Sequence, residues 1–210
     1  MARQSIFRAV FFDFGGVLTT SVWDSFADFC RSEGLEPGTI KALFRTDPEA
    51  LRELRQLETG EITEEEFEQA FGRRLGLKDP EHLIDSMFAG MQPEEHMVAA
   101  VKELRAARLL IGLITNSWST NHYDRKLLAE LFDTAVISAE VHMHKPQPEI
   151  YRLAAERLEV APEESIFVDD LRENCDGAEA VGMTAVLHRN PPETIARLTE
   201  LTGIELAAAA

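Results

Sequence analysis

Short apolar runs alternate with helical patterns along most of the chain. The first run, at residues 10–12, is followed by four more that read as buried strands, spaced widely enough for helices to lie between them. Strands and helices that alternate in this order predict a doubly wound α/β core with a parallel sheet. The later predicted strands are residues 109–114, 135–138, 166–168 and 184–187, and the predicted helices are residues 125–131, 149–158, 174–181 and 193–201.

One long stretch interrupts this alternation. Residues 21–95 are rich in helix-forming and charged residues, with short breaks at glycine and proline and no strand pattern. Thr63 and Glu66, ahead of Phe67 and Phe71, have the form of a capping box that opens an amphipathic helix. Because this stretch follows the first strand, it can cover the carboxyl edge of the sheet as a lid. The predicted division is a core of residues 1–18 and 96–210 and a helical cap of residues 19–95.

The bulk composition narrows the class of partner. The chain has 210 residues, of which 37 are acidic and 21 basic, so its formal net charge is −16. This charge disfavours attraction to nucleic acid or to an anionic membrane. The sequence contains neither a signal-peptide pattern nor an apolar run long enough to span a membrane, and Cys30 and Cys175 lack metal-ligand spacing. We therefore expect a cytoplasmic protein that binds neither nucleic acid nor membrane, with an oligomeric state that the sequence does not reveal.

Asp13 is the first candidate for chemistry. It ends the first predicted strand and is followed by Gly15 and Gly16. Parallel α/β sheets place ligands just beyond the carboxyl ends of their strands, and glycines let the backbone approach a bound anion or metal closely. The segment therefore predicts a strand that delivers a nucleophile into a tight turn.

Polar residues also follow other predicted strands, and one lysine lies in a nearby loop. The carboxyl ends of parallel strands share one edge, so we expect these side chains to meet Asp13 in one cleft. Three carboxylates gathered there need a cation to offset their repulsion, and ligands that are all oxygens favour Mg²⁺. The lysine and the threonine would then hold the anionic end of a substrate. The residues are Thr115, Asn116, Lys145, Asp169 and Asp170.

Four segments resemble the four motifs of the haloacid dehalogenase (HAD) superfamily of aspartate-nucleophile hydrolases. They are residues 13–18, 113–118, 144–151 and 167–174, and their order and spacing cover nearly the whole chain. The second and third segments together resemble the N-terminal phosphatase-type domain of soluble epoxide hydrolases and their bacterial relatives. The resemblance implies a Rossmann-like core with a helical cap inserted after the first motif.

The resemblance also implies a role for each residue. Asp13 would attack the phosphorus of a small phosphorylated metabolite and form an aspartyl-phosphate. Lys145 would neutralise charge on the nucleophile and on the phosphoryl oxygens. The implied Mg²⁺ ligands are Asp13, the backbone carbonyl of Gly15, Asp170 and, directly or from behind the other ligands, Asp169. The implied phosphate-binding residues are Thr115, Asn116, Gly16 and Lys145.

Gly15 departs from the family pattern. Phosphatases of this superfamily usually carry an aspartate there, which protonates the leaving oxygen and later activates water. Losing this help costs roughly 10²–10⁴-fold in rate unless another group substitutes. The candidate substitutes are Thr19, Thr20, His142 and His144, or a residue of the cap.

Two other functions therefore stay open beside the phosphatase. A dehalogenase would fit a missing acid, because a halide leaves without a proton. Dehalogenases of this superfamily, however, typically carry an aromatic residue at the position of Gly15 and lack the pair Asp169 and Asp170. The other alternative is a catalytically impaired, phosphate-binding or regulatory HAD protein. Trp23 and Trp118 either line the substrate pocket or pack between cap and core.

Overall fold

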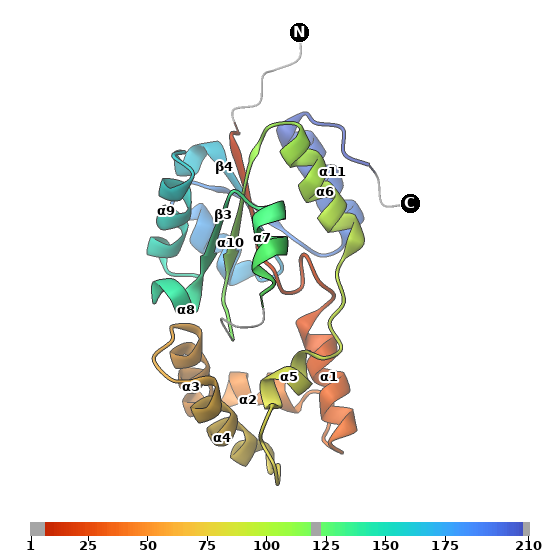
Figure 1. The fold of residues 1–210 in the computed structure, drawn as a ribbon, viewed down its shortest axis with the longest axis vertical. Coiled ribbons are helices and arrows are strands. Elements are labelled where there is room, and N and C mark those ends of the chain that lie inside the picture. The colour runs from red at the N-terminus through yellow and green to blue at the C-terminus, as the bar shows by residue number, and fades with distance from the viewer. Residues whose placement is uncertain (1–6, 119–122, 208–210) are drawn as a thin grey trace.

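A five-stranded parallel sheet lies at the centre of the molecule, in the order β3-β2-β1-β4-β5 (Figure 1). The computed structural model describes residues 7–118 and 123–207. The predicted α/β fold is confirmed, with the strand that carries Asp13 in the middle of the sheet. The strands are β1 (Ala9–Phe12), β2 (Leu110–Thr115), β3 (Thr134–Ile137), β4 (Ser165–Asp169) and β5 (Thr184–Leu187).

Helices cover both faces of the sheet. Val10 and Phe12 of β1 pack into one apolar cluster, whereas Ala9 and Phe11 pack into the other. Both faces of β1 are thus buried, which explains why its sequence is apolar throughout rather than alternating. The helices on the first face are α6 (Glu95–Ala106), α7 (Arg125–Leu131) and α11 (Pro191–Thr202), and those on the second are α9 (Pro148–Arg157) and α10 (Arg172–Glu179).

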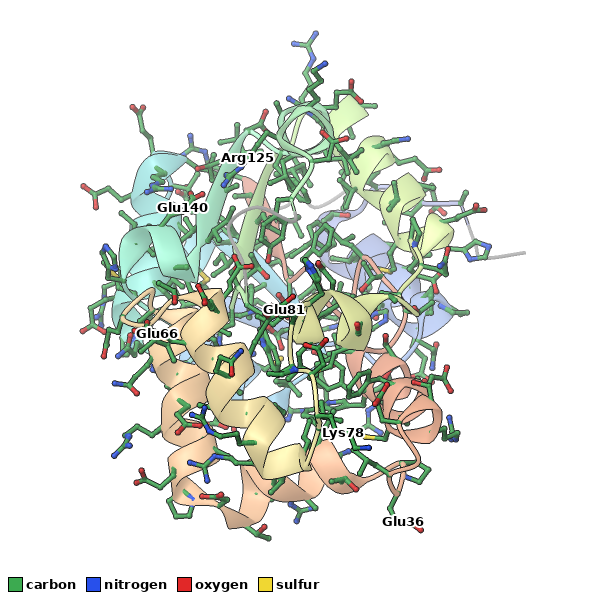
Figure 2. The ribbon with its side chains drawn as sticks, turned by 60° about the horizontal axis from the view of Figure 1, so that its bottom comes forward. Glu36, Glu66, Lys78, Glu81, Arg125 and Glu140 are labelled. Carbon is green, nitrogen blue, oxygen red and sulfur yellow. The ribbon has the colours of Figure 1, made fainter. Side chains whose placement is uncertain are left out.

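A helical insert follows β1 and lies beyond the carboxyl ends of the strands (Figure 1). Its inward-facing aromatic and aliphatic residues, such as Phe67 and Phe71, form a separate apolar cluster. Charged side chains, including Glu36, Lys78 and Glu81, lie on its outer surface (Figure 2). The insert therefore has a core of its own. Its helices are α1 (Val22–Ser32), α2 (Thr39–Thr46), α3 (Pro48–Glu58), α4 (Glu64–Leu75) and α5 (Leu83–Phe88).

Two connecting segments join the insert to the sheet side by side. The Thr20 N–H donates to the Gln92 carbonyl at 2.8 Å, and the Glu94 N–H donates to the Leu18 carbonyl at 2.9 Å. The predicted helical insert after β1 is confirmed. The predicted domain bounds at residues 18 and 96 stay a prediction, supported by these paired connections.

Several elements lie where the sequence predicts them. Residues 125–131 and 184–187 form α7 and β5, and the capping box of Thr63 and Glu66 is formed. Two short elements, α8 (Ser138–Val141) and the 3₁₀ turn η1 (Pro162–Glu164), are not predicted, because a single turn carries no periodicity. Ser138 therefore begins a helix rather than ending a strand.

Within the described ranges, no helix is long and apolar enough to cross a membrane. Cys30 and Cys175 are both buried and form no disulfide with each other. The cytoplasmic location stays a prediction.

Candidate active site

The register of the sheet places Asp13 beside the end of β4. Phe12 pairs with Leu113 of β2 on one side and with Val168 of β4 on the other. The Asp13 N–H continues this pattern by donating to the Val168 carbonyl at 2.9 Å. Asp169 follows Val168 directly, so the two carboxylates extend from neighbouring strand ends, as the topology predicts.

The Lys145 ammonium lies between these carboxylates. Its Nζ is 2.8 Å from Asp13 Oδ1 and 2.7 Å from Asp169 Oδ2, and Lys145 is only 3% exposed. Burial alone would lower the pKa of Lys145, but the two carboxylates raise it above its ordinary value. Lys145 therefore stays charged, and its loop brings it to Asp13 as predicted.

Both oxygens of Asp169 are occupied by the protein. Asn174 Nδ2 donates to the two oxygens at 3.0 and 3.1 Å, and the Leu171 N–H donates to Oδ1 at 2.8 Å. Asp169 is 0% exposed and does not line the cavity described below. Its observed contacts orient Lys145, which favours a place behind the metal ligands rather than among them.

Gly16 allows Asp170 to approach the turn after β1. A Cβ at position 16 would lie 2.8 Å from Asp170 Oδ2, and Gly16 has a φ of +76°, which favours glycine. The Gly16 N–H donates to Thr19 Oγ1 at 3.1 Å. Gly16 is not among the cavity-lining residues, so its predicted contact with phosphate stays a prediction.

Asp13, Asp169 and Asp170 form an acidic cluster that could hold a metal ion. Each offers an oxygen, and these oxygens lie within 4.8 Å of one another. Burial, with the neighbouring carboxylates adding to it, raises the pKa of Asp13 to about 7 against the opposing effect of Lys145. Burial and Asp169 likewise raise the pKa of Asp170 to about 6. The single ammonium of Lys145 does not balance three carboxylates, so the cluster keeps an excess of negative charge when they are ionised. A divalent cation would offset this excess.

Asn116 joins the end of β2 to the loop of Lys145. Its Nδ2 donates to the Lys145 carbonyl at 3.1 Å, and its Oδ1 accepts from the Lys145 N–H at 2.8 Å. Thr115 is 2% exposed, and its Oγ1 lies 3.4 Å from the Tyr123 hydroxyl. Both residues line the cavity beside Asp13, and Asn116 also positions Lys145.

A cavity of about 420 Å³ separates the sheet edge from the insert. Its floor carries Asp13, Lys145 and Asp170, whereas its wall is mostly apolar and aromatic. Trp23 and Trp118 both line it, and the Trp118 ring also packs against phenylalanines of the insert. Trp118 therefore fills both roles that the sequence leaves open. The full set of residues in this apolar wall cannot be predicted from the sequence, because the packing of the helices of the insert determines which side chains face the cavity.

The space beside Gly15 is already filled. A Cβ at position 15 would lie 2.9 Å from Val22 Cγ2, closer than real side chains approach. An aspartate there would therefore require Val22 to move.

Most of the predicted substitutes for the missing acid are engaged elsewhere. His142 Nδ1 lies 2.8 Å from the Thr59 carbonyl, and His144 Nδ1 lies 2.8 Å from the Lys145 carbonyl. Thr20 Oγ1 accepts from the Gln92 N–H at 3.0 Å. Of the four named residues only Thr19 lines the cavity, and its hydroxyl donates to the Thr20 carbonyl at 3.1 Å. One acidic residue of the insert, Glu58, also lines the cavity and is not predicted by name from the sequence.

Comparison with known proteins places this geometry in a family. The model of the haloacid dehalogenase-like hydrolase family matches residues 7–182. Acyl-CoA dehydrogenase family member 10 of Mus musculus is 30% identical over 209 residues, which cover 95% of this chain and 20% of that protein. Bifunctional epoxide hydrolase 2 of Sus scrofa is 28% identical over 219 residues, covering 95% and 39%. The chain thus spans less than half the length of these two relatives.

A third relative matches along nearly its whole length. Sesquiterpene phosphatase astK of Aspergillus oryzae is 30% identical over 204 residues, which cover 94% of this chain and 97% of that protein. The similarity to an epoxide hydrolase and to a phosphatase confirms the family resemblance predicted from the four motifs.

Solved structures share the fold at lower identity. A predicted HAD-like hydrolase from Porphyromonas gingivalis has a TM-score of 0.71 at 21% identity, covering 94% of this chain and 98% of that chain. A HAD family enzyme from Bacteroides thetaiotaomicron, in complex with magnesium and inorganic phosphate, has 0.66 at 20%, covering 87% and 94%. L-2-haloacid dehalogenase from Xanthobacter autotrophicus has 0.65 at 22%, covering 95% and 84%. The same fold therefore occurs in a protein that binds phosphate and in a dehalogenase. The fold alone does not distinguish these two functions, so the residues of the site have to distinguish them.

Proposed function

Because the chain belongs to the haloacid dehalogenase-like hydrolase family, we propose that it is a Mg²⁺-dependent phosphatase of small phosphorylated metabolites. The observation that carries this proposal is the acidic cluster around the nucleophile. Asp13, Asp169 and Asp170 meet at one strand edge with a single lysine among them. A site of this charge suits a divalent cation and a phosphoryl group better than a halide, whose release needs no metal.

Asp13 and Asp170, with the backbone carbonyl of Gly15, would hold the ion. When bound, Mg²⁺ would neutralise charge on the phosphoryl oxygens and on the carboxylates. It would thereby keep Asp13 ionised despite the burial that raises its pKa. Asp169 would act from behind by fixing the Lys145 ammonium against Asp13.

The protein's own residues would divide the reaction into two displacements. Asp13 would attack phosphorus and form an aspartyl-phosphate, which water then hydrolyses. Lys145, anchored by Asn116 and Asp169, would balance the charge of the transferring group. Thr115 and Asn116 line the cavity beside Asp13, where they would contact the phosphoryl oxygens.

The rest of the substrate would face the apolar wall of the cavity. Trp23, Phe88 and Trp118 line this wall, and about 420 Å³ suits a small molecule. We therefore propose a phosphomonoester of an apolar alcohol. The name of the fungal relative, sesquiterpene phosphatase, points to a substrate of the same character.

The first test is phosphatase activity itself. Wild-type protein is expected to release p-nitrophenol from p-nitrophenyl phosphate with Mg²⁺ and to lose this activity in EDTA. Asp13→Asn should lower turnover at least ~10⁴-fold, because the nucleophile is removed. Asp28→Asn, which changes an exposed carboxylate on α1, serves as the matched control. Absence of turnover in the wild type, or full activity in Asp13→Asn, would contradict the proposal.

A second measurement tests the substrate class. The value of kcat/KM for hexyl phosphate should exceed that for glycerol 1-phosphate by tenfold or more, since each buried methylene contributes about 0.8 kcal/mol. Metal-independent release of halide from 2-haloacids, without phosphatase activity, would instead identify a dehalogenase.

A further inference from the structure

Glu58 is a buried carboxyl group without a partner. It ends α3 of the insert, is 9% exposed and lines the same cavity as Asp13. In residues 7–118 and 123–207, its carboxyl group makes neither a hydrogen bond nor an ion pair. Every fully buried side-chain oxygen among the described residues has a hydrogen-bond partner, so the unpaired oxygens of Glu58 face the open space of the cavity, where a ligand can meet them.

The backbone of Glu58 is fixed against the core. Ser138 Oγ donates to the Glu58 carbonyl at 2.6 Å and accepts from the Ser117 N–H at 2.8 Å. On the next residue, the Thr59 carbonyl pairs with His142 Nδ1 at 2.8 Å. The end of α3 is thus tied to the segment that follows Thr115 and Asn116, and Glu58 lines the same cavity as these two residues.

The position of Glu58 in the cavity is suited to protonating a leaving group rather than to attacking phosphorus. In phosphoryl transfer the attacking and leaving oxygens lie roughly in line across phosphorus. Asp13 would attack from the sheet edge, so the leaving oxygen would point toward the insert. Glu58 is the carboxylic acid that the insert contributes to the cavity lining.

The ionisation of Glu58 is compatible with donating a proton. Burial raises its pKa to about 8, with Asp13 adding to the increase, while Lys145 and Arg55 oppose it. At neutral pH the group therefore carries a proton, and it can lose that proton to a developing alkoxide.

We propose that Glu58 is the general acid and base of the reaction, in the role left vacant at Gly15. This inference rests on the phosphatase function proposed above. In the first step the Asp13 oxygen bonds to phosphorus, the bond to the leaving oxygen breaks, and the Glu58 proton passes to that oxygen to give the alcohol. In the second step the Glu58 carboxylate takes a proton from water as the water oxygen bonds to phosphorus. The bond to Asp13 then breaks, inorganic phosphate forms, and Glu58 is again protonated.

The experiment compares leaving groups in Glu58→Gln. Glutamine has the size of the protonated acid but cannot supply its proton. The value of kcat/KM reports the first step, whereas hydrolysis of the aspartyl-phosphate is the same for both esters. For hexyl phosphate, whose alkoxide is a poor leaving group, kcat/KM should fall about 10²–10⁴-fold. For p-nitrophenyl phosphate, whose leaving group hardly needs protonation, kcat/KM should fall less than about tenfold. Glu65→Gln, at an exposed position of α4, should leave both rates unchanged.

The outcomes separate the two proposals. If the wild type hydrolyses both esters but Glu58→Gln lowers kcat/KM equally for both or for neither, the role of Glu58 is overturned while the phosphatase stands. If the wild type hydrolyses neither, the phosphatase proposal falls, and the role of Glu58 falls with it. Glu58→Asp keeps a carboxyl group and should recover part of the hexyl phosphate rate, which a purely structural role would not predict.

Discussion

At the sheet edge Asp13, Asp169 and Lys145 hold one another by ion pairs, whereas across the cavity Glu58 stands in an apolar wall with no ion pair to any described residue. The first arrangement is preorganised by the protein. The second leaves the Glu58 carboxyl group to make its hydrogen bonds with what enters the cavity. The difference indicates a division of labour, in which the core fixes the attacking group and the insert deals with the leaving group.

The largest effect is expected from breaking the core arrangement. Lys145→Met would leave Asp13 and Asp169 buried without their ammonium partner, and should lower the free energy of unfolding by about 3–5 kcal/mol. Urea denaturation measures this loss, with the exposed Lys126→Met on α7 as control. A loss below about 1 kcal/mol, as for an exposed pair, would show that the sheet edge is not preorganised as described.

The insert should respond to pH through Glu58. Its pKa rises from 4.5 to about 8 on folding, so the folded state binds the proton more tightly. Stability from this group is complete below pH 4.5 and is lost as the pH rises toward 8. Glu58→Gln removes this loss and should be more stable than the wild type at pH 8 by about 1–3 kcal/mol.

The free energy of unfolding of Glu58→Gln is compared with that of the wild type at pH 5 and at pH 8, by denaturation. The difference between the two proteins isolates Glu58, because the other acids titrate equally in both. A stability difference that does not change between these two pH values would contradict the raised pKa of Glu58.

Introducing an acid at position 15, where related phosphatases usually carry one, should lower the stability of the protein through a steric clash. Gly15→Asp brings a Cβ to 2.9 Å from Val22 Cγ2 and should destabilise the protein by about 1–3 kcal/mol. Adding Val22→Ala to Gly15→Asp should recover most of the lost stability. When these two substitutions are combined with Glu58→Gln, the new aspartate should restore the turnover of hexyl phosphate that Glu58→Gln lowers. Gly38→Asp, at a position with nothing within 4 Å of its Cβ, is the matched control. Equal stability of Gly15→Asp and Gly38→Asp would argue against the contact with Val22.

An effect no larger than the last is expected where the two regions are tied together. Ser138→Ala removes the donor to the Glu58 carbonyl and the acceptor of the Ser117 N–H, and should cost about 1–3 kcal/mol. Hydrogen exchange at the Ser117 amide should become faster, whereas Ser32→Ala on α1 should leave it unchanged. Unaltered exchange at Ser117 in Ser138→Ala would mean that this tie does not hold the insert to the core.

Much of the sheet edge can be predicted from the sequence, because topology alone brings the ends of parallel strands together. Asp13, Thr115 and Asp169 follow apolar runs and meet as expected. Lys145 requires the further step that its loop folds back to this edge, which is expected from its place after a predicted strand. The finer contacts, such as Asn116 with the Lys145 backbone, depend on loop geometry that no periodicity encodes.

The inner wall of the insert is harder to predict. Helical periodicity shows which residues of α3 share a face, but not what that face meets. One signal was nevertheless present: Ala50, Leu54 and Leu57 mark the apolar face, and Glu58, four residues after Leu54, falls on it. An acid at a position where the pattern predicts an apolar residue is a candidate for a functional role.

The central place of β1 has a consequence for motion. This strand is paired on both sides, and all four of its residues are 0% exposed. Segments of this kind open only with global unfolding, so their amides are among the slowest to exchange. Asp13 thus directly follows a strand whose backbone is among the best protected in the molecule, so the direction of its carboxylate is set by the part of the fold that opens last.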